Sequence, residues 1–117
     1  MDCLFCQIPA GQVPVPGGMI YEDDLVCACH YAQSGTPEYL GYVVAQPKRH
    51  AKTFADLSDD EARAMGLLIA RLARALDECC GAERAYMEFY GEVTPHLHVF
   101  LTARYPGLPS EYWRANI

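Results

Sequence analysis

Apolar residues between Leu57 and Ala82 recur every three or four positions, which is the spacing of one face of an α-helix. Ser58 and Glu61 stand three residues apart at the start of this segment, in the pattern of a capping box. Gly81 lies where a helix commonly ends. The segment therefore predicts a helix with a single apolar stripe. The residues of that stripe are Met65, Leu68, Ile69, Leu72, Leu76 and Cys79.

Short runs of β-branched and aromatic residues lie on both sides of the predicted helix and favour strands. The strand candidates are residues 19–24, 25–31, 41–47, 84–91 and 95–103, with a loop at 33–39. Strands, one long helix and further strands, in that order, predict an antiparallel sheet with helix on one side, which is an α+β fold. No repeat or linker divides the 117 residues, so we expect one domain over residues 1–117.

Composition and charge narrow the class of protein. A net charge of −6, with scattered lysines and arginines, argues against nucleic acid as the main partner. No apolar run approaches the roughly 20 residues that a membrane-spanning helix needs, and the N-terminus lacks the pattern of a secretion signal. Six cysteines without such a signal favour a reducing, cytoplasmic location, where paired cysteines more often bind metal or stay free than form disulfides.

Two histidines one residue apart are the most chemically suggestive feature of the chain. If residues 94–102 are extended, side chains alternate between two faces. One face then carries Thr94, His96, His98, Phe100 and Thr102, and the other carries Leu97, Val99, Leu101 and Ala103. The second face is apolar and is expected to meet the core. A neutral imidazole is a good nucleophile toward phosphorus, and its other nitrogen can donate a hydrogen bond. The alternative is a strand with two solvated histidines.

Cysteine spacing indicates a metal site near the N-terminus. Cys3 and Cys6 form a Cys-x-x-Cys pair, which can hold one tetrahedral metal ion through two thiolates. The chain has no second pair of this spacing, so a closed site needs ligands from elsewhere. A free thiol pair and a redox pair are the alternatives. Cys27 and Cys29 alternate along a predicted strand and are expected to be small core residues.

Several motifs in a fixed order resemble the histidine triad superfamily of nucleotide hydrolases and transferases. They are CLFC, YEDD, GYVVAQPKRH, DLSDDEARAMGLL and TPHLHVFLTARYPG. The resemblance runs from Cys3 to about Tyr112. It implies a five-stranded antiparallel sheet with one long helix and a short N-terminal helix, a homodimer, and a small-molecule nucleotide as partner.

The resemblance also implies roles for particular residues. The middle motif histidine, His98, would attack the α-phosphorus of a nucleotide derivative and form a nucleotidyl-histidine intermediate that water hydrolyses. His96 would belong to its supporting network. Phosphoramidates and dinucleoside polyphosphates are the implied substrates. The implied substrate-binding residues are Tyr31, Thr94, Phe100, Thr102 and Arg104. The implied structural zinc site consists of Cys3, Cys6, His50 and His96.

The sequence departs from the family pattern at the site itself. Phe100 stands where the third motif histidine is usual, and phenylalanine carries no proton. Tyr42 replaces a frequent histidine before the Pro-Lys motif. Tyr31, or His30 if the strand slips by one residue, replaces a frequent aspartate that binds ribose. Thr102 lies on the histidine face and offers a weak substitute donor.

These departures leave open the registration of the motif and, among three alternatives, the function. A second registration makes Thr94, His96 and His98 the three motif positions, with His96 as the nucleophile. The chain is either a hydrolase or a zinc-stabilised nucleotide- or ligand-binding protein with little or no catalytic activity. A nucleotidyltransferase is the third alternative, although such enzymes carry glutamine at the position of Phe100.

Overall fold

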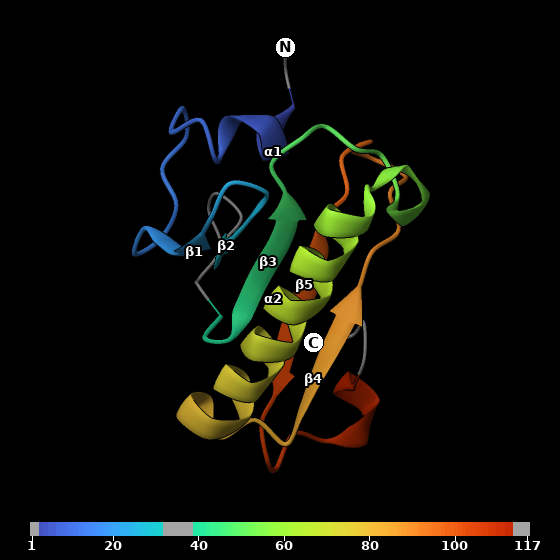
Figure 1. Ribbon diagram of the computed structural model, residues 1–117. Helices are drawn as coiled ribbons and strands as arrows, with labels where there is room; N and C mark the ends of the chain where they lie inside the picture. Colours follow the sequence, from blue (N-terminus) through green and yellow to red (C-terminus); the bar gives the residue numbers. More distant parts are fainter. Residues whose placement is uncertain (1–2, 32–38, 114–117) are drawn as a thin grey trace.

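The computed structural model describes residues 3–31 and 39–113. The sheet has five antiparallel strands in the order β1-β2-β3-β5-β4. Figure 1 shows α2 lying across one face of this sheet. The strands are β1 (Met19–Glu22), β2 (Val26–His30), β3 (Tyr42–Pro47), β4 (Arg84–Glu88) and β5 (Val99–Arg104). The helices are α1 (Leu4–Gln7), η1 (Phe54–Asp56), α2 (Asp59–Cys80) and η2 (Ser110–Tyr112). The predicted α+β fold is confirmed.

Local capping chemistry places both ends of α2 where the sequence predicts them. The Ser58 hydroxyl accepts from the backbone N–H of Glu61 at 3.1 Å, and the Glu61 carboxylate accepts from the backbone N–H of Ser58 at 2.8 Å. Gly81 ends the helix with a φ of 72°, a left-handed conformation that glycine adopts without strain. Cys79 is exposed, so its assignment to the apolar stripe was wrong. Cys80 packs on the core instead, because four residues from Leu76 bring a side chain back to the buried face.

The sheet buries both faces, each against a different helix. The face under α2 carries the larger core. The residues of the C-terminal segment that belong to this core are Leu97, Val99, Leu101 and Ala103, as predicted. The opposite face forms a second cluster under α1, built from Cys3, Phe5, Ile8, Cys29 and Val44. Cys27 and Cys29 are both buried, which confirms them as core residues. The second cluster matters for function because the histidines lie beside it.

The histidine segment differs from its prediction as strand. β5 begins at Val99, so the predicted strand 95–103 starts four residues too early and ends one residue too soon. Pro95 has no backbone N–H for a sheet ladder, and the chain bends there, with His96 N donating to Thr94 O at 2.9 Å. Leu97 N donates to Ala51 O at 2.7 Å.

Two further expectations concern segments rather than single residues. Of the loop expected at 33–39, only Tyr39 falls among the described residues. Within residues 3–31 and 39–113, no helix has the length and apolar character needed to cross a membrane.

Candidate active site and metal centre

Four residues from three parts of the chain form a cluster that can hold a metal ion. Their ligand atoms all lie within 4.8 Å of one another. His96 Nδ1 lies 3.4 Å from the sulfur of Cys3, 3.4 Å from the sulfur of Cys6 and 3.2 Å from His50 Nδ1. The sulfur of Cys6 lies 3.2 Å from His50 Nδ1. Thiolate and imidazole are the ligands that structural zinc and related ions prefer.

Backbone structure explains why these side chains meet. The carbonyl oxygen of Cys3 accepts from the N–H groups of Cys6 and Gln7, so the single turn of α1 turns both thiols to one side. His96 Nε2 donates to the carbonyl oxygen of Pro47 at 2.9 Å. Its Nδ1 therefore keeps a lone pair directed at the cluster. Burial lowers the pKa of His96, which favours the neutral ring that can act as a ligand.

His98 has a fixed ring orientation beside this cluster. Its Nδ1 donates to the carbonyl oxygen of His96 at 2.6 Å, which leaves Nε2 with the lone pair. The ring stacks on Phe5, with centroids 4.0 Å apart and planes 9° apart. Phe89 and Phe100 meet it edge-on at 5.4 and 5.2 Å. Burial lowers the pKa of His98, so the ring favours its uncharged, nucleophilic form.

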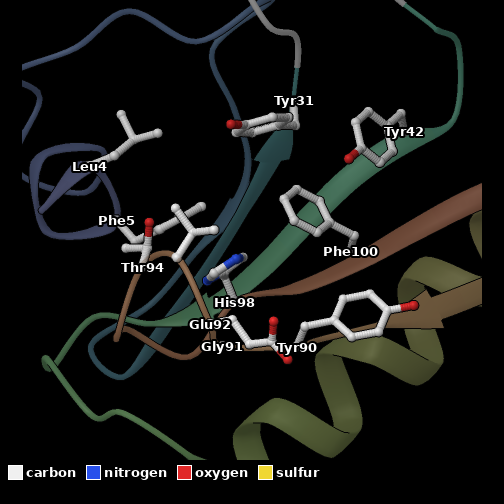
Figure 2. Close-up of a pocket in the computed structure, with 11 residues that line it drawn as sticks. Leu4, Phe5, Tyr31, Tyr42, Tyr90, Gly91, Glu92, Thr94, His98 and Phe100 are labelled. Atoms are coloured by element: carbon white, nitrogen blue, oxygen red, sulfur yellow. The ribbon is translucent and has the colours of Figure 1, made fainter. Parts of the chain in front are cut away.

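His98 lines a cavity of about 470 Å³ on the α1 side of the sheet (Figure 2). Tyr31, Tyr42 and Phe100 form an aromatic wall on one side, where Tyr42 stacks on Phe100 with centroids 5.2 Å apart. The segment from Tyr90 to Thr94 forms another side. The full lining is Leu4, Phe5, Tyr31, Tyr42, Tyr90, Gly91, Glu92, Val93, Thr94, His98 and Phe100, which includes no lysine or arginine among the described residues.

Comparison with known proteins relates this arrangement to one family. No family model matches the chain. A curated HIT-like protein of Methanocaldococcus jannaschii is 34% identical over 59 residues, which are 50% of this chain and 42% of that protein, so the match spans less than half of the relative. A protein from Streptococcus mutans is 30% identical, with a TM-score of 0.70, over 89% of this chain and 66% of that one. A HIT family protein from Bacillus anthracis, 23% identical, has the same fold, with a TM-score of 0.75 over 91% and 75%.

One of the similar solved structures is a zinc-bound protein. A zinc-bound histidine triad protein from Mycobacterium smegmatis is 25% identical, with a TM-score of 0.74, over 92% of this chain and 78% of that one. This chain belongs to the histidine triad (HIT) superfamily. Phe100, at the position where the resemblance implies a third motif histidine, is stacked against Tyr42.

The HIT chain brings some of the predicted site residues together and separates others. Tyr31, Thr94 and Phe100 line the cavity with His98, as the resemblance implied. His96 turns away into the metal cluster with both ring nitrogens engaged, which favours the registration that makes His98 the nucleophile. All four implied metal ligands come together.

Thr102 and Arg104 do not lie among the cavity-lining residues. Thr102 stands further along β5, opposite Tyr42 and Tyr86 in the ladder. The Arg104 guanidinium is engaged at the end of that strand, where it forms an ion pair with Glu83 at 2.9 Å and donates to the Tyr86 hydroxyl at 2.8 Å. Its central carbon also lies 3.8 Å from the centre of the Trp113 ring. The contacts of the Arg104 guanidinium therefore lie outside the cavity beside His98.

Sequence reasoning did not name several residues of the site. Phe5 lies between the two cysteines in CLFC, and the spacing of the cysteines gives it no role of its own. Phe89 and Tyr90 lie just beyond β4, and they reach the site because the chain turns back at Gly91, whose φ is 71°. An excess of aromatic residues near the motif segments was the available signal, but contacts between rings depend on the tertiary fold.

Proposed function

We propose that this HIT protein is a hydrolase that attacks the α-phosphorus of a nucleotide derivative through a covalent nucleotidyl-histidine intermediate on His98. The observation that carries this proposal is the 2.6 Å hydrogen bond from His98 Nδ1 to the His96 carbonyl oxygen. That bond fixes the tautomer, so the lone pair of Nε2 belongs to a side chain that lines the cavity. Phosphoramidates and dinucleoside polyphosphates are the proposed substrates.

The reaction divides one displacement into two. Nε2 of His98 forms a bond to phosphorus, and the bond from phosphorus to the leaving group breaks, with its electron pair going to that group. The ring becomes cationic, and the hydrogen bond from Nδ1 to the His96 carbonyl strengthens as this charge develops. Water then attacks phosphorus, and the electron pair of the P–N bond returns to Nε2. Stacking on Phe5 holds the ring in place throughout.

We propose zinc as the metal of the cluster, in a structural role. Zinc bonds of about 2.3 Å to sulfur and about 2.0–2.1 Å to nitrogen, arranged tetrahedrally, separate two nitrogens by about 3.3 Å and nitrogen from sulfur by about 3.5 Å. The nitrogen–nitrogen separation of 3.2 Å and the nitrogen–sulfur separations of 3.2–3.4 Å in the cluster fit that arrangement. Four protein ligands close the coordination sphere. The ion would fasten α1 and the segment preceding β5 together.

A binding protein with little or no catalysis is the second candidate function. The observation that favours it is the composition of the cavity wall. Phe100 carries no proton, and among the described lining residues the charged group is the carboxylate of Glu92. A polyphosphate chain would find no cation there to offset its charge. A ligand with an aromatic ring would instead pack against Tyr31, Tyr42 and Phe100.

One set of assays distinguishes the two functions. Turnover of adenosine and guanosine phosphoramidates and dinucleoside polyphosphates is measured for the native chain, for His98→Ala, and for His98→Gln, which keeps a polar side chain of similar bulk. The hydrolase is supported if both variants lose turnover while their melting temperatures stay close to the native value. Nucleotide binding by calorimetry without turnover supports the binding protein, as does turnover that appears only in Phe100→His.

We also propose a cytoplasmic homodimer. The cytoplasm fits the six cysteines, all of them free, because thiolate ligands need a reducing environment. A dimer fits the outer position of β4 in the sheet, where Met87 is half exposed. Light scattering during size-exclusion chromatography tests the oligomeric state, and a monomeric mass at micromolar concentration would contradict it.

A further inference from the structure

Two tyrosine hydroxyls in the cavity wall have no hydrogen-bond partner among the described residues. Within residues 3–31 and 39–113, the hydroxyls of Tyr31 and Tyr42 make no hydrogen bond, although both side chains line the cavity. Five other tyrosine hydroxyls of the described chain are engaged. These are the hydroxyls of Tyr21, Tyr39, Tyr86, Tyr90 and Tyr105. A phenol that lines a cavity without a partner is available to a ligand.

The position of Tyr42 relates it directly to the missing third histidine. Its ring stacks on Phe100 with an angle of 18° between the planes, and Tyr31 meets it edge-on at 89°. Tyr42 also belongs to β3, where it pairs with Thr102 of β5, so the sheet ladder holds its backbone. Figure 2 shows its hydroxyl on the side of the ring that faces Phe100 and His98.

The proposed reaction needs a proton at this part of the cavity. A leaving group such as an alkylamine departs from phosphorus only when its nitrogen gains a proton. Phe100 has none to give. Burial raises the pKa of Tyr42, so its phenol keeps its proton at neutral pH.

We propose that Tyr42 is the general acid that protonates the leaving group, in the role that Phe100 cannot fill. This inference rests on the proposed hydrolase function. In the first step the P–N bond to His98 forms, the bond to the leaving group breaks, and the phenolic proton of Tyr42 goes to the departing atom. In the second step water attacks phosphorus, the electron pair returns to Nε2, and a proton of that water restores the phenol. The net reaction consumes one water and releases the nucleoside monophosphate and the protonated leaving group.

Two substrates separate this role from a packing role. Adenosine 5′-monophosphate p-nitrophenyl ester releases p-nitrophenolate, which departs without a proton at neutral pH. Adenosine 5′-phosphoramidate of an alkylamine requires the proton. Rates on both are measured for Tyr42→Phe, which removes only the hydroxyl and keeps the ring on Phe100. Tyr31→Phe tests the other unpartnered phenol, and Tyr21→Phe, in β1 outside the cavity, controls for the substitution itself.

Tyr42→Phe is expected to lower kcat on the phosphoramidate by about 10²-fold or more, because general acid catalysis contributes about 10²–10⁴-fold. The rate on the p-nitrophenyl ester should change by less than about 5-fold, since no proton is needed there. Equal effects on both substrates, no effect, or a selective loss in Tyr31→Phe instead would each overturn the assignment. Turnover of the p-nitrophenyl ester that survives His98→Ala would reject the proposed reaction through His98, so the two failures are distinguishable.

Discussion

Phe5 stacks on His98 with the two ring centroids 4.0 Å apart and the planes 9° apart. Phe5 lies between Cys3 and Cys6, two members of the metal cluster, on the single turn of α1. The cluster therefore contacts the proposed nucleophile through the Phe5 ring, in addition to the hydrogen bond from His98 Nδ1 to the His96 carbonyl oxygen. Helix α1 has four residues, too few to persist alone in water, so its position depends on what it is fastened to.

Removal of the metal is expected to weaken both the fold and the activity. Cys3→Ser, or treatment with a strong chelator, should lower the free energy of unfolding by about 3 kcal/mol or more, roughly 10 °C in Tm. Metal analysis of protein purified without chelator should find about one zinc per chain, and the variant should lose it. Cys79→Ser, at an exposed thiol outside the cluster, is the control. Equal zinc content in the two variants would contradict the site.

Loss of the aromatic contact should affect turnover more than stability. Phe5→Leu keeps an apolar side chain on α1 but removes the stacked ring, so His98 gains freedom to leave its reactive orientation. We expect kcat to fall about 10-fold or more and stability to fall by about 1 kcal/mol. Phe54→Leu, at a half-exposed ring on η1, is the matched control. Equal kcat values for the two variants would contradict a positioning role for Phe5.

A histidine at position 100 should compensate for the loss of the Tyr42 hydroxyl. Phe100→His places a proton donor at the third motif position, beside the ring of Tyr42. In a Tyr42→Phe background, this change should recover about 10-fold or more of the lost rate on an alkylamine phosphoramidate. In the native background the gain should be smaller, because Tyr42 already supplies the proton. Identical gains in both backgrounds would mean that the two side chains act independently.

The ion pair that supports α2 makes the fold sensitive to acid. Arg49 Nη2 donates to the Glu61 carboxylate at 2.9 Å, and with the backbone N–H of Ser58 it lowers the pKa of Glu61 from 4.5 to about 2. Because the pKa of Glu61 is lower in the folded state than in the unfolded state, its ionised carboxylate stabilises the fold at pH values above about 4.5. This stabilisation is lost as pH falls from about 4.5 through about 2. Glu61→Gln should therefore cost about 1–2 kcal/mol at pH 7, with the difference vanishing near pH 2 in urea titrations.

The control for Glu61 is a more exposed ion pair on the same helix. Asp60 and Arg63 lie 2.9 Å apart with side chains 81% and 73% exposed, so Asp60→Asn should change stability by less than about 0.5 kcal/mol at either pH. A pH-independent difference between native protein and Glu61→Gln would indicate that Glu61 acts through its cap hydrogen bond alone.

Local chemistry explains why much of the fold is predictable from sequence. Ser58, Glu61 and Gly81 determine the ends of α2 through contacts within one or two turns, so their pattern is visible in the chain. The alternation from Leu97 to Ala103 is likewise local, and each of its apolar members is buried. The start of β5 was misjudged because the bend at Pro95 competes with the strand pattern.

The candidate site depends on contacts between distant segments, which a single sequence does not display. His50 and His96 are 46 residues apart and meet only in the fold, so the sequence indicates their pairing through family resemblance alone. Arg104 was assigned to substrate by the same resemblance, but Glu83, Tyr86 and Trp113 occupy its guanidinium. The aromatic wall had no sequence signature, because stacking depends on rotamers and register.

Mass spectrometry of the intact protein, quenched during turnover of an adenosine phosphoramidate, tests directly whether His98 is the nucleophile. We expect an adduct with the mass of one adenylyl group, labile in acid and stable in base, which peptide mapping places on His98. His98→Ala should show no adduct and no turnover. Turnover without an adduct on the native chain under rapid quench, or an adduct on another residue, would contradict the assignment of His98 as the nucleophile.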